Sequence, residues 1–475
     1  MRRTKIVCTI GPASESPEVI RALLEAGMDV ARLNFSHGTL DEQAQRIRRL
    51  REEAARAGKI LAILLDIQGP KIRLGRFAQP VHVEAGEKLV LTSEPVPCTR
   101  ERVSVGYPHL ARDLAPGQHI FIDDGLIELE VEEVRGSDVV CRVLVGGELR
   151  SRKGVSLPGV EVDLPPATEE DCRHIRFGVE MGVDFIAASF VRRAEHVEAI
   201  REVVRQAGGD QPIIAKIESE EGVRRIDEIV AAADGVMVAR GDLGVETPLE
   251  QVPLVQRLII EKCNRAGKPV ITATQMLESM VENHRPTRAE VTDVANAIIE
   301  GTDAVMLSGE TAVGRYPVEA VRVMARICER IEESLPYEEM LEKKRIYARR
   351  DIAEAISYAT CQTASDLNAA AILSSTQSGS TARMVSKYRP RAPIIAVTPA
   401  PEVVRRLALV WGVHPLLVEK SDNIDDMLDV AVRAAETAGL IRTGDLIAIT
   451  AGVRTNMAGS TNLLQVIRVG EARSR

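Results

Sequence analysis

A lysine and a glutamate two positions apart have the types and spacing that most clearly suggest chemistry in this sequence. Lys216 and Glu218 stand at the end of the apolar run Pro212–Ile217, and Asp242 follows the next apolar run, Gly235–Gly241. Side chains at positions i and i+2 of a β-strand point to the same face. An ammonium and two carboxylates facing one way form either a salt bridge or a site for Mg²⁺, which prefers oxygen ligands and keeps waters that a substrate can replace. We favour the metal site.

Other polar side chains stand where further apolar runs end. They are Arg32, Asn34, Ser36, His37, Asp66, Thr274, Ser308 and Glu310, with the apolar Phe35 standing between Asn34 and Ser36. Any strand end that meets water turns polar, so a single Ser or Glu there indicates little. The eight histidines include no pair with zinc-site spacing, and the chain has no P-loop or dinucleotide-binding glycine motif. Phosphate must therefore be bound by other means, such as Arg32, Arg73 and Lys153.

Eight apolar runs alternate with amphipathic stretches and predict a (β/α)8 barrel, an α/β fold. The runs are Lys5–Gly11, Asp29–Ser36, Ile60–Asp66, Val183–Phe190, Pro212–Ile217, Gly235–Gly241, Pro269–Gln275 and Asp303–Ser308. They are apolar at consecutive positions, as strands covered on both faces require. Barrels of this kind carry their chemistry at the C-terminal ends of the strands, which is where the polar residues stand.

The rhythm of strands and helices changes twice along the chain. Residues 70–166 show short β-rich pieces separated by Gly and Pro, which predict an all-β domain inserted after strand 3. We expect this inserted β-barrel to close over the site as a lid. The (β/α)8 barrel is then expected at residues 1–69 and 167–340, and a C-terminal α/β domain for effector binding and oligomerisation at 345–475.

Composition narrows the class of protein. The chain has 475 residues, 45% hydrophobic and 27% charged, which predicts two or three folded domains. A formal net charge of −8 disfavours nucleic-acid binding. No apolar run approaches the ~20 residues of a membrane span. The seven cysteines are spread singly, which is typical of free thiols in a reducing compartment. We expect a cytoplasmic protein that binds neither nucleic acid nor membrane.

The chain contains long, ordered motifs, including KIVCTIGPAS (Lys5–Ser14), ARLNFSHG (Ala31–Gly38), AKIE (Ala215–Glu218), ARGDLGV (Ala239–Val245) and MLSGETAVGRYP (Met306–Pro317). Through these motifs it resembles pyruvate kinase, of the bacterial type, along nearly its full length. The resemblance implies the same layout of barrel, inserted β domain and C-terminal α/β domain. It also implies a phosphotransferase that moves the phosphoryl group of phosphoenolpyruvate to ADP, giving pyruvate and ATP in the last step of glycolysis.

The resemblance further implies roles for the site residues. Lys216 would neutralise the transferring group and the enolate, Arg32 would grip the phosphoryl group, and Thr274 would orient the water that protonates the enolate carbon. Substrate contacts are expected from Arg32, Lys216, Gly241, Asp242, Thr274, Ser308 and Glu310. Nucleotide contacts are expected from Asn34, Phe35, Ser36, His37, Arg73 and Lys153. Glu218 and Asp242 would hold Mg²⁺, for which Mn²⁺ is a possible substitute.

One segment departs from the familiar K⁺-dependent form of the family. That form reads Thr-Lys-Gly-Pro-Glu, whereas this chain reads Ile67-Gln68-Gly69-Pro70-Lys71. The resemblance implies a monovalent-cation site at Asn34, Ser36, Asp66 and the Ile67 carbonyl. We hypothesise that the Lys71 ammonium supplies the charge of K⁺, which is then not required, because two neighbouring cations in a poorly screened site repel by several kcal/mol. The alternative is that Lys71 points to solvent.

A loop in the C-terminal domain combines hydroxyls, a glycine and the start of a predicted helix. Thr376, Ser378, Gly379, Ser380 and Thr381 form it. Such a loop suits an anion, here a phosphorylated allosteric effector, or it simply caps the helix. The resemblance also implies a homo-oligomer, a tetramer.

Two rival functions stay open at this point. One is a Mg²⁺-dependent lyase or mutase that acts on phosphoenolpyruvate or another enolate, because the same metal and barrel would serve it. The other is a catalytically inactive sensor that keeps only the effector domain. Formation of pyruvate that depends on ADP separates the kinase from both.

Overall fold

The computed structural model describes residues 1–347, 351–420, 423–452 and 461–471. Eight parallel strands close the central barrel, in the order β1-β2-β3-β12-β13-β14-β15-β16 around the ring. They are β1 (Lys5–Thr9), β2 (Val30–Asn34), β3 (Ala62–Asp66), β12 (Phe185–Ala188), β13 (Ile213–Ile217), β14 (Gly235–Ala239), β15 (Val270–Ala273) and β16 (Ala304–Leu307). This closed ring confirms the predicted (β/α)8 barrel.

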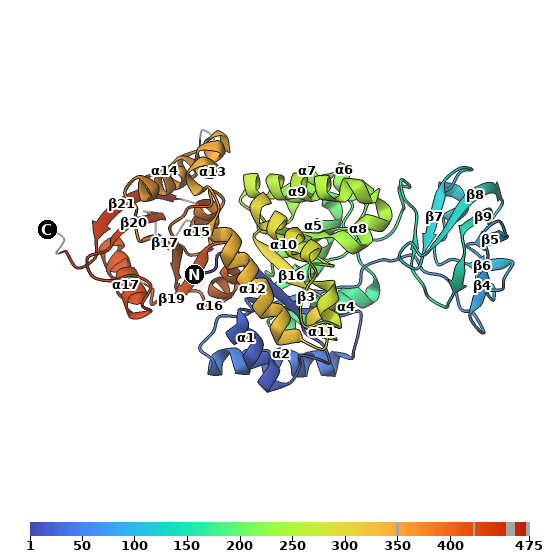
Figure 1. Cartoon of the computed structure of the whole chain (residues 1–475), viewed down its shortest axis with the longest axis horizontal. Coiled ribbons are helices and arrows are strands. Elements are labelled where there is room, and N and C mark those ends of the chain that lie inside the picture. The colour runs from blue at the N-terminus through green and yellow to red at the C-terminus, as the bar shows by residue number, and fades with distance from the viewer. Residues whose placement is uncertain (348–350, 421–422, 453–460, 472–475) are drawn as a thin grey trace.

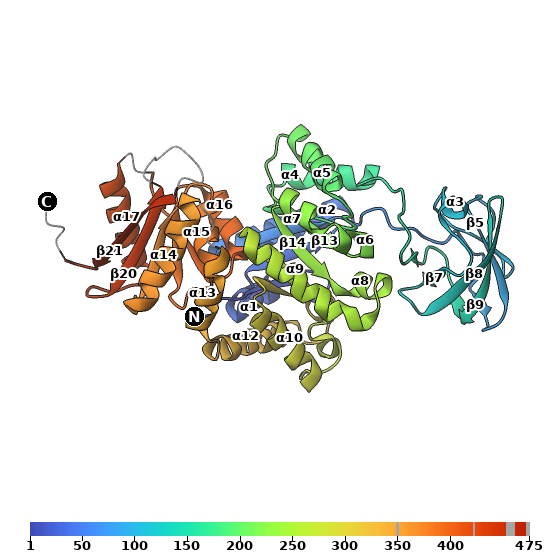
Figure 2. The ribbon, with the colours of Figure 1, turned by 90° about the horizontal axis from the view of Figure 1, so that it is seen from above.

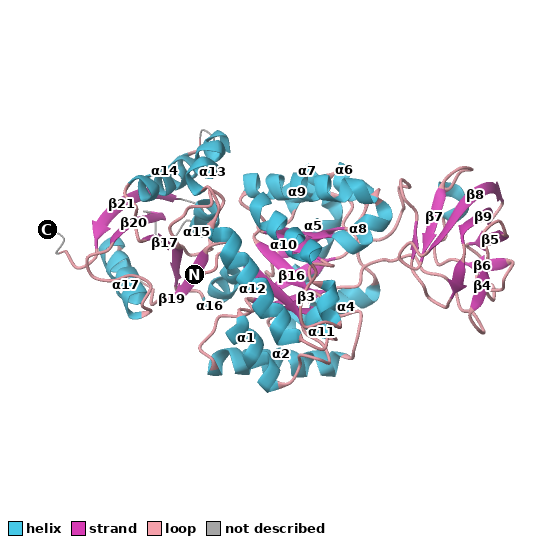
Figure 3. Ribbon diagram, viewed as in Figure 1, coloured by secondary structure: helices cyan, strands magenta, loops and turns pink. Residues whose placement is uncertain are grey.

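Helices surround the barrel and cover its outer face (Figures 1 and 3). The longer ones are α1 (Pro17–Ala26), α2 (Leu40–Arg56), α4 (Glu169–Glu180), α5 (Ala194–Gln206), α9 (Val252–Ala266), α10 (Arg288–Glu300) and α12 (Pro317–Glu333). Shorter helices are α6 (Glu220–Arg224), α7 (Ile226–Ala232), α8 (Arg240–Glu246), η1 (Leu249–Gln251), η2 (Glu278–Val281) and α11 (Gly309–Ala312). Helix α1 begins at Pro17, because the Ser16 hydroxyl accepts a hydrogen bond from the Val19 N–H at 3.3 Å and proline suits the first turn.

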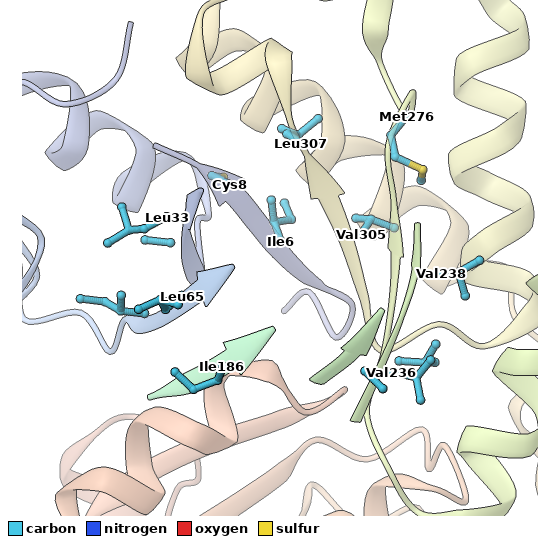
Figure 4. Close-up of a cluster of buried hydrophobic side chains, with 14 of the residues drawn as sticks. Ile6, Cys8, Leu33, Leu65, Ile186, Val236, Val238, Met276, Val305 and Leu307 are labelled. Atoms are coloured by element: carbon cyan, nitrogen blue, oxygen red, sulfur yellow. The ribbon is translucent and has the colours of Figure 1, made fainter. Parts of the chain in front are cut away.

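Alternate strand residues divide between two apolar layers. One set, including Ile6, Leu33, Ile186 and Val236, packs outward against the helices (Figure 4). The intervening residues, such as Met237, fill the inside of the barrel. Every residue of β1, β3 and β13 is buried, which explains why the runs read as continuously apolar.

The chain between β3 and α4 forms the predicted β-rich insertion. Its elements are β4 (Val81–Val83), β5 (Lys88–Thr92), β6 (Arg102–Ser104), α3 (Leu110–Asp113), β7 (His119–Ile122), β8 (Ile127–Arg135), β9 (Asp138–Val145), β10 (Gly147–Leu149) and β11 (Val155–Ser156). Six strands form a curled sheet in the order β11-β7-β8-β9-β5-β6, and β10 pairs with β4. The inserted domain has its own apolar core and lies at one end of the molecule (Figure 2).

The C-terminal part is an α/β domain at the opposite end (Figure 2). Its elements are α13 (Tyr337–Lys344), η3 (Arg345–Tyr347), α14 (Ile352–Asp366), β17 (Ala371–Ser375), α15 (Ser380–Ser386), β18 (Ile394–Thr398), α16 (Pro401–Arg406), η4 (Leu407–Leu409), β19 (Val413–Leu417), α17 (Ile424–Thr437), β20 (Leu446–Gly452) and β21 (Thr461–Arg468). The sheet order is β19-β18-β17-β20-β21, with only β21 antiparallel to its neighbour. The predicted C-terminal α/β fold is thereby confirmed.

The C-terminal domain closes the bottom of the barrel. Ala408 and Leu409 of η4 belong to the apolar cluster that fills the barrel interior. We call these η4 residues the η4 plug. Polar contacts lie beside it, since Lys5 Nζ donates to the Val413 carbonyl at 2.8 Å and Arg405 pairs with the buried Asp184 at 2.7 Å. The opposite, C-terminal ends of the strands therefore remain open for chemistry.

No helix in the described part of the chain combines the length and apolar character that crossing a membrane requires.

Candidate active site

The top of strand β13 brings Lys216 and Glu218 together as the i, i+2 spacing predicts. Lys216 Nζ lies 3.1 Å from Glu218 Oε1 and 3.1 Å from Asp66 Oδ1, and it donates to the Ser189 hydroxyl at 2.6 Å. Burial opposes the charge on Lys216, but attraction from Asp66 and Glu218 prevails and raises the Lys216 pKa. Burial also raises the pKa of Glu218, against the attraction of Lys216. The lysine is thus held charged among oxygen atoms.

Strands β2 and β3 add an arginine to this buried group. Arg32 Nε lies 2.6 Å from Asp66 Oδ2, and its Nη1 donates to the Thr9 hydroxyl at 3.0 Å. Burial alone would raise the Asp66 pKa, but attraction to Arg32 and Lys216 lowers it. One carboxylate therefore orients two cations toward the barrel mouth, where an anionic substrate group would meet both.

Lys71 is turned into the site. Its Nζ lies 2.7 Å from Asp242 Oδ1 and 3.5 Å from Asp124 Oδ1 of the inserted domain, above the Phe190 ring at 5.8 Å. Burial would lower its pKa, but Asp242 raises it. The Phe190 N–H donates to Glu218 Oε2 at 2.6 Å. The Lys71 ammonium therefore points into the site, where it pairs with Asp242, one of the two carboxylates that the sequence predicts as metal ligands.

The residues expected at a monovalent-cation site already have protein partners. The Ile67 carbonyl accepts the Ser189 hydroxyl at 2.7 Å, and Asn34 Oδ1 accepts the Ser36 N–H at 3.1 Å. The Asp66 carboxylate is occupied by Arg32 and Lys216.

Thr274 has an unusual backbone. Its φ is +67° and that of Gln275 is +53°, in the left-handed region that β-branched residues avoid. The Thr274 hydroxyl accepts the Gly241 N–H at 2.8 Å and donates to the Ala273 carbonyl at 2.7 Å. The end of β15 is thereby joined to the start of α8, next to Asp242.

Two predicted substrate residues lie at the end of β16. Glu310 is fully buried, and its carboxylate accepts the backbone N–H groups of Ser308 at 2.7 Å and Leu277 at 3.0 Å. Both oxygens of Glu310 are thus used to tie two loops together. The Ser308 hydroxyl is buried and has no hydrogen-bond partner among the described residues.

The predicted nucleotide residues are more dispersed. Phe35 is buried, with its ring 5.3 Å from that of His174 and 6.0 Å from that of Phe177, so only its backbone can reach a ligand. His37 is exposed beside it. Arg73 and Lys153 stand side by side where the chain enters and leaves the inserted domain, each with a partner there: Arg73 donates to the Arg152 carbonyl at 3.0 Å, and Lys153 lies 2.7 Å from Asp123.

Three residues at the site were not singled out from the sequence. Ser189 bridges Lys216 and the Ile67 carbonyl, Phe190 binds Glu218 through its N–H, and Arg240 donates to the Thr274 carbonyl at 2.7 Å. Ser189 and Phe190 end the fourth apolar run, so the strand-end rule applied to every run would have found them.

The predicted effector loop opens α15. Gly379, with φ +79°, precedes the helix, the Thr381 hydroxyl is 2.8 Å from that of Thr461, and Arg383 Nη1 donates to the Ser378 carbonyl at 3.2 Å. Thr376 is buried and Ser380 begins the helix.

The donor set fits a magnesium ion in part. Within the described residues no three His, Cys, Asp or Glu side chains are grouped to hold a metal. Glu218 and Asp242 provide two carboxylates, which suits an ion that takes its other ligands from substrate and water.

Fold and site together define a barrel enzyme with a charged lysine, an arginine and carboxylates gathered at the strand ends, a combination suited to metal-assisted chemistry on an anionic substrate. Two family models match the chain: pyruvate kinase, barrel domain, over residues 1–321, and pyruvate kinase, alpha/beta domain, over residues 354–467. The chain belongs to the pyruvate kinase family.

Its relatives include the pyruvate kinase of Geobacillus stearothermophilus, which is 55% identical over 98% of this chain and 80% of the relative. The pyruvate kinase of Clostridium acetobutylicum is 47% identical over 98% of this chain and 99% of the relative. That of Bacillus licheniformis is 51% identical over 99% of this chain and 81% of the relative. The protein is an enzyme that transfers the phosphoryl group of phosphoenolpyruvate to ADP, in a family that uses a divalent metal. This decides against the lyase or mutase and against the inactive sensor.

Proposed function

We propose that the chain is a Mg²⁺-dependent pyruvate kinase that does not require K⁺, with Glu218 and Asp242 as the protein ligands of Mg²⁺ or of Mn²⁺ in its place. When bound, the divalent ion neutralises charge on the phosphoryl and carboxylate oxygens of the substrate. Glu218 is pre-oriented by the Phe190 N–H, whereas Asp242 must exchange its contact with Lys71 for the metal.

The side chains around Glu218 and Asp242 bind the substrate, neutralise its charge and orient the water that protonates the enolate. Arg32 binds the phosphoryl group, and Lys216 neutralises the charge of the transferring group and of the enolate. The raised pKa of Lys216 supports this role, because the ammonium then stays charged across the physiological range. The Gly241 backbone and Thr274 hold the substrate carboxylate, and the Thr274 hydroxyl orients the water that protonates the enolate. Ser308 and Glu310 are the remaining substrate residues, at the end of β16, where Glu310 joins the backbones of Ser308 and Leu277.

The nucleotide lies between the barrel and the inserted domain, residues 70–166, which closes as a lid. Asn34, Ser36, His37 and the Phe35 backbone contact it from the barrel side. Arg73 and Lys153 contact it from the base of the lid, where opposite charge would attract the phosphates of ADP.

The position of Lys71 carries the proposal that K⁺ is not needed. Its ammonium, 2.7 Å from Asp242, adds a tethered positive charge to the site. The Ile67 carbonyl and the Asp66 carboxylate, expected ligands of K⁺, already have protein partners. A second, mobile cation here would be repelled by Lys71 and Lys216.

A coupled assay tests the divalent site. Pyruvate formation from phosphoenolpyruvate should require both ADP and Mg²⁺, and the D242N and E218Q variants should each lose about 10²-fold or more of kcat. Glu319→Gln, on exposed α12 surface, is the matched control and should be unchanged. Pyruvate formed at the full rate without ADP would overturn the proposal. So would an E218Q enzyme with normal metal dependence.

We further propose that the enzyme works as a homotetramer in the cytoplasm and that the loop Thr376 to Thr381 binds a phosphorylated effector. Apolar side chains exposed on α9 and α10 support an oligomer, namely Leu254, Leu258, Val291 and Ile299. Seven free cysteines support a reducing compartment.

A further inference from the structure

We infer that Arg240 is a positioning residue that holds Thr274 in the orientation in which its hydroxyl directs the water that protonates the enolate. The inference rests on the proposed role of Thr274. It concerns a residue that neither binds metal nor faces the phosphoryl group in the assignments above.

Thr274 needs external support for its backbone. A threonine at φ +67° followed by a residue at φ +53° is strained, because the branched Cβ crowds the backbone in the left-handed region. Such a conformation persists only where surrounding contacts determine it. The contacts that hold Thr274 are therefore part of what places its hydroxyl.

Arg240 supplies these contacts. Its Nη2 donates to the Thr274 carbonyl at 2.7 Å and its Nε to the Ala273 carbonyl at 3.2 Å, so one guanidinium grips the backbone on both sides of the Thr274 Cα. The next residue, Gly241, donates its N–H to the Thr274 hydroxyl at 2.8 Å. Two consecutive residues of α8 thus fix both the backbone and the side chain of Thr274.

Arg240 is itself held from outside the site. Its Nη1 lies 2.7 Å from Asp293 Oδ1 of α10 and donates to Gln256 Oε1 of α9 at 3.4 Å. The Arg240 side chain is only 11% exposed. A planar guanidinium with several donors in fixed directions can make all of these contacts together, which the ammonium of a lysine cannot.

The reaction step that Arg240 affects is the protonation of the enolate. The C3 carbon of enolpyruvate takes a proton from water, the electron pair of its C=C bond forms the new C–H bond, and the enolate oxygen becomes the ketone carbonyl. The hydroxide left behind is protonated from solvent. Thr274 orients the water, and Arg240 sets the direction of the Thr274 hydroxyl, so loss of Arg240 should slow this step more than phosphoryl transfer.

Exchange of the pyruvate methyl hydrogens reports the step directly. By microscopic reversibility, enzyme with Mg²⁺, ATP and pyruvate in D2O exchanges these hydrogens with solvent, and proton NMR measures the rate. ATP formation from phosphoenolpyruvate and ADP reports phosphoryl transfer. We expect Arg240→Met to lower exchange about 10²-fold and ATP formation about threefold, within the range that proton-transfer groups contribute. Arg240→Lys should recover part of the exchange.

A double-mutant cycle with Thr274→Ala separates the inference from the role on which it rests. Arg240→Met should change exchange by less than about twofold in the T274A background, because its effect passes through Thr274. If T274A alone leaves exchange normal, the role of Thr274 is wrong. If T274A slows exchange but R240M slows it equally in both backgrounds, or slows exchange and ATP formation alike, the inference about Arg240 is wrong.

Two further variants keep the test decisive. Asp293→Asn loosens Arg240 while leaving it present, and it provides the same cycle with a smaller effect should R240M fail to fold. Arg326→Met removes an exposed arginine whose partner is Glu319, and its exchange rate should equal that of the wild type. An exchange rate in D293N identical to the wild type would count against the inference.

Discussion

At the scale of single residues, the buried charges of the site compensate one another. Lys216 is buried with two carboxylates, and Arg32 shares one of them. Lys71 pairs with a third carboxylate, Asp242, which we propose as a metal ligand. Removing one member of such a group leaves its partner uncompensated, which makes each substitution informative.

On the proposed assignment of Asp242 as a metal ligand, Lys71 competes with the divalent ion for this carboxylate, which gives a prediction for metal affinity. Lys71→Met should bind Mn²⁺ about fivefold more tightly than the wild type in the absence of substrates, since a part-exposed ion pair is worth up to ~1 kcal/mol. Titration followed by electron paramagnetic resonance measures this. Lys59→Met, at an exposed lysine, is the control. Equal or weaker affinity in K71M would show that Lys71 does not compete.

Residue spacing predicts local geometry well and distant pairing poorly. The i, i+2 rule places Lys216 and Glu218 on one face, and the Ser16-Pro17 signal places the start of α1. The partner of Lys71 is Asp242, far along the chain, and no local pattern encodes that contact. The inward turn of Phe35 and the φ of Thr274 depend on neighbouring elements in the same way.

At the scale of elements, the structure depends on two junctions with the barrel. The first joins the end of α8 to the inserted domain, where Glu246 interacts with the Ser156 hydroxyl and the Leu157 backbone N–H. The second is the η4 turn, which enters the bottom of the barrel.

Glu246 makes the first junction sensitive to pH. Burial raises its pKa to about 7, against the attraction of Arg192. A carboxyl with a folded pKa above its unfolded value stabilises the fold below about pH 4.5, and that contribution is lost as pH rises through 7. Glu246→Gln should therefore gain stability over the wild type at pH 8, by up to about 3 kcal/mol relative to their difference at pH 4.5. Urea unfolding at both pH values measures this, and a difference that does not change with pH would contradict it.

Packing of the η4 plug into the barrel should increase the free energy of unfolding. Leu409 is fully buried in the barrel interior, so Leu409→Ala should lose about 2–5 kcal/mol of unfolding free energy through lost burial and a cavity. Chemical denaturation checks this value. Leu417→Ala, at a leucine that is 56% exposed, should change stability by less than ~0.5 kcal/mol. Similar small losses in both variants would mean that the plug adds little.

The fold class, a barrel with an inserted β domain and a C-terminal α/β domain, was readable from the sequence because the spacing and type of the apolar runs change twice along the chain. The packing of η4 into the bottom of the barrel could not be predicted from the sequence, because Leu407 to Leu409 look like any other short apolar stretch. Only tertiary packing shows that these residues complete a core built by another domain.

At the scale of the whole molecule, three domains lie in a row, with the barrel between the C-terminal domain and the inserted domain (Figure 1). Helices α9 and α10 present exposed apolar side chains. If the enzyme is a tetramer built through this face, the charged variant Leu254→Asp should dissociate into smaller species. Light scattering after gel filtration measures the mass, with Leu417→Asp as the control at an exposed leucine elsewhere. A wild-type monomer, or an L254D tetramer, would contradict the proposed interface.

The most direct test of the central claim is a KCl titration of the wild type and of Lys71→Glu, assayed for pyruvate formation with Mg²⁺ and ADP in a tetramethylammonium buffer free of sodium and potassium. The account predicts that the wild type is fully active without KCl and unchanged by it, whereas K71E is nearly inactive and recovers on adding KCl. A wild-type enzyme that is inactive until KCl is added would contradict the claim that Lys71 supplies the charge of the monovalent ion.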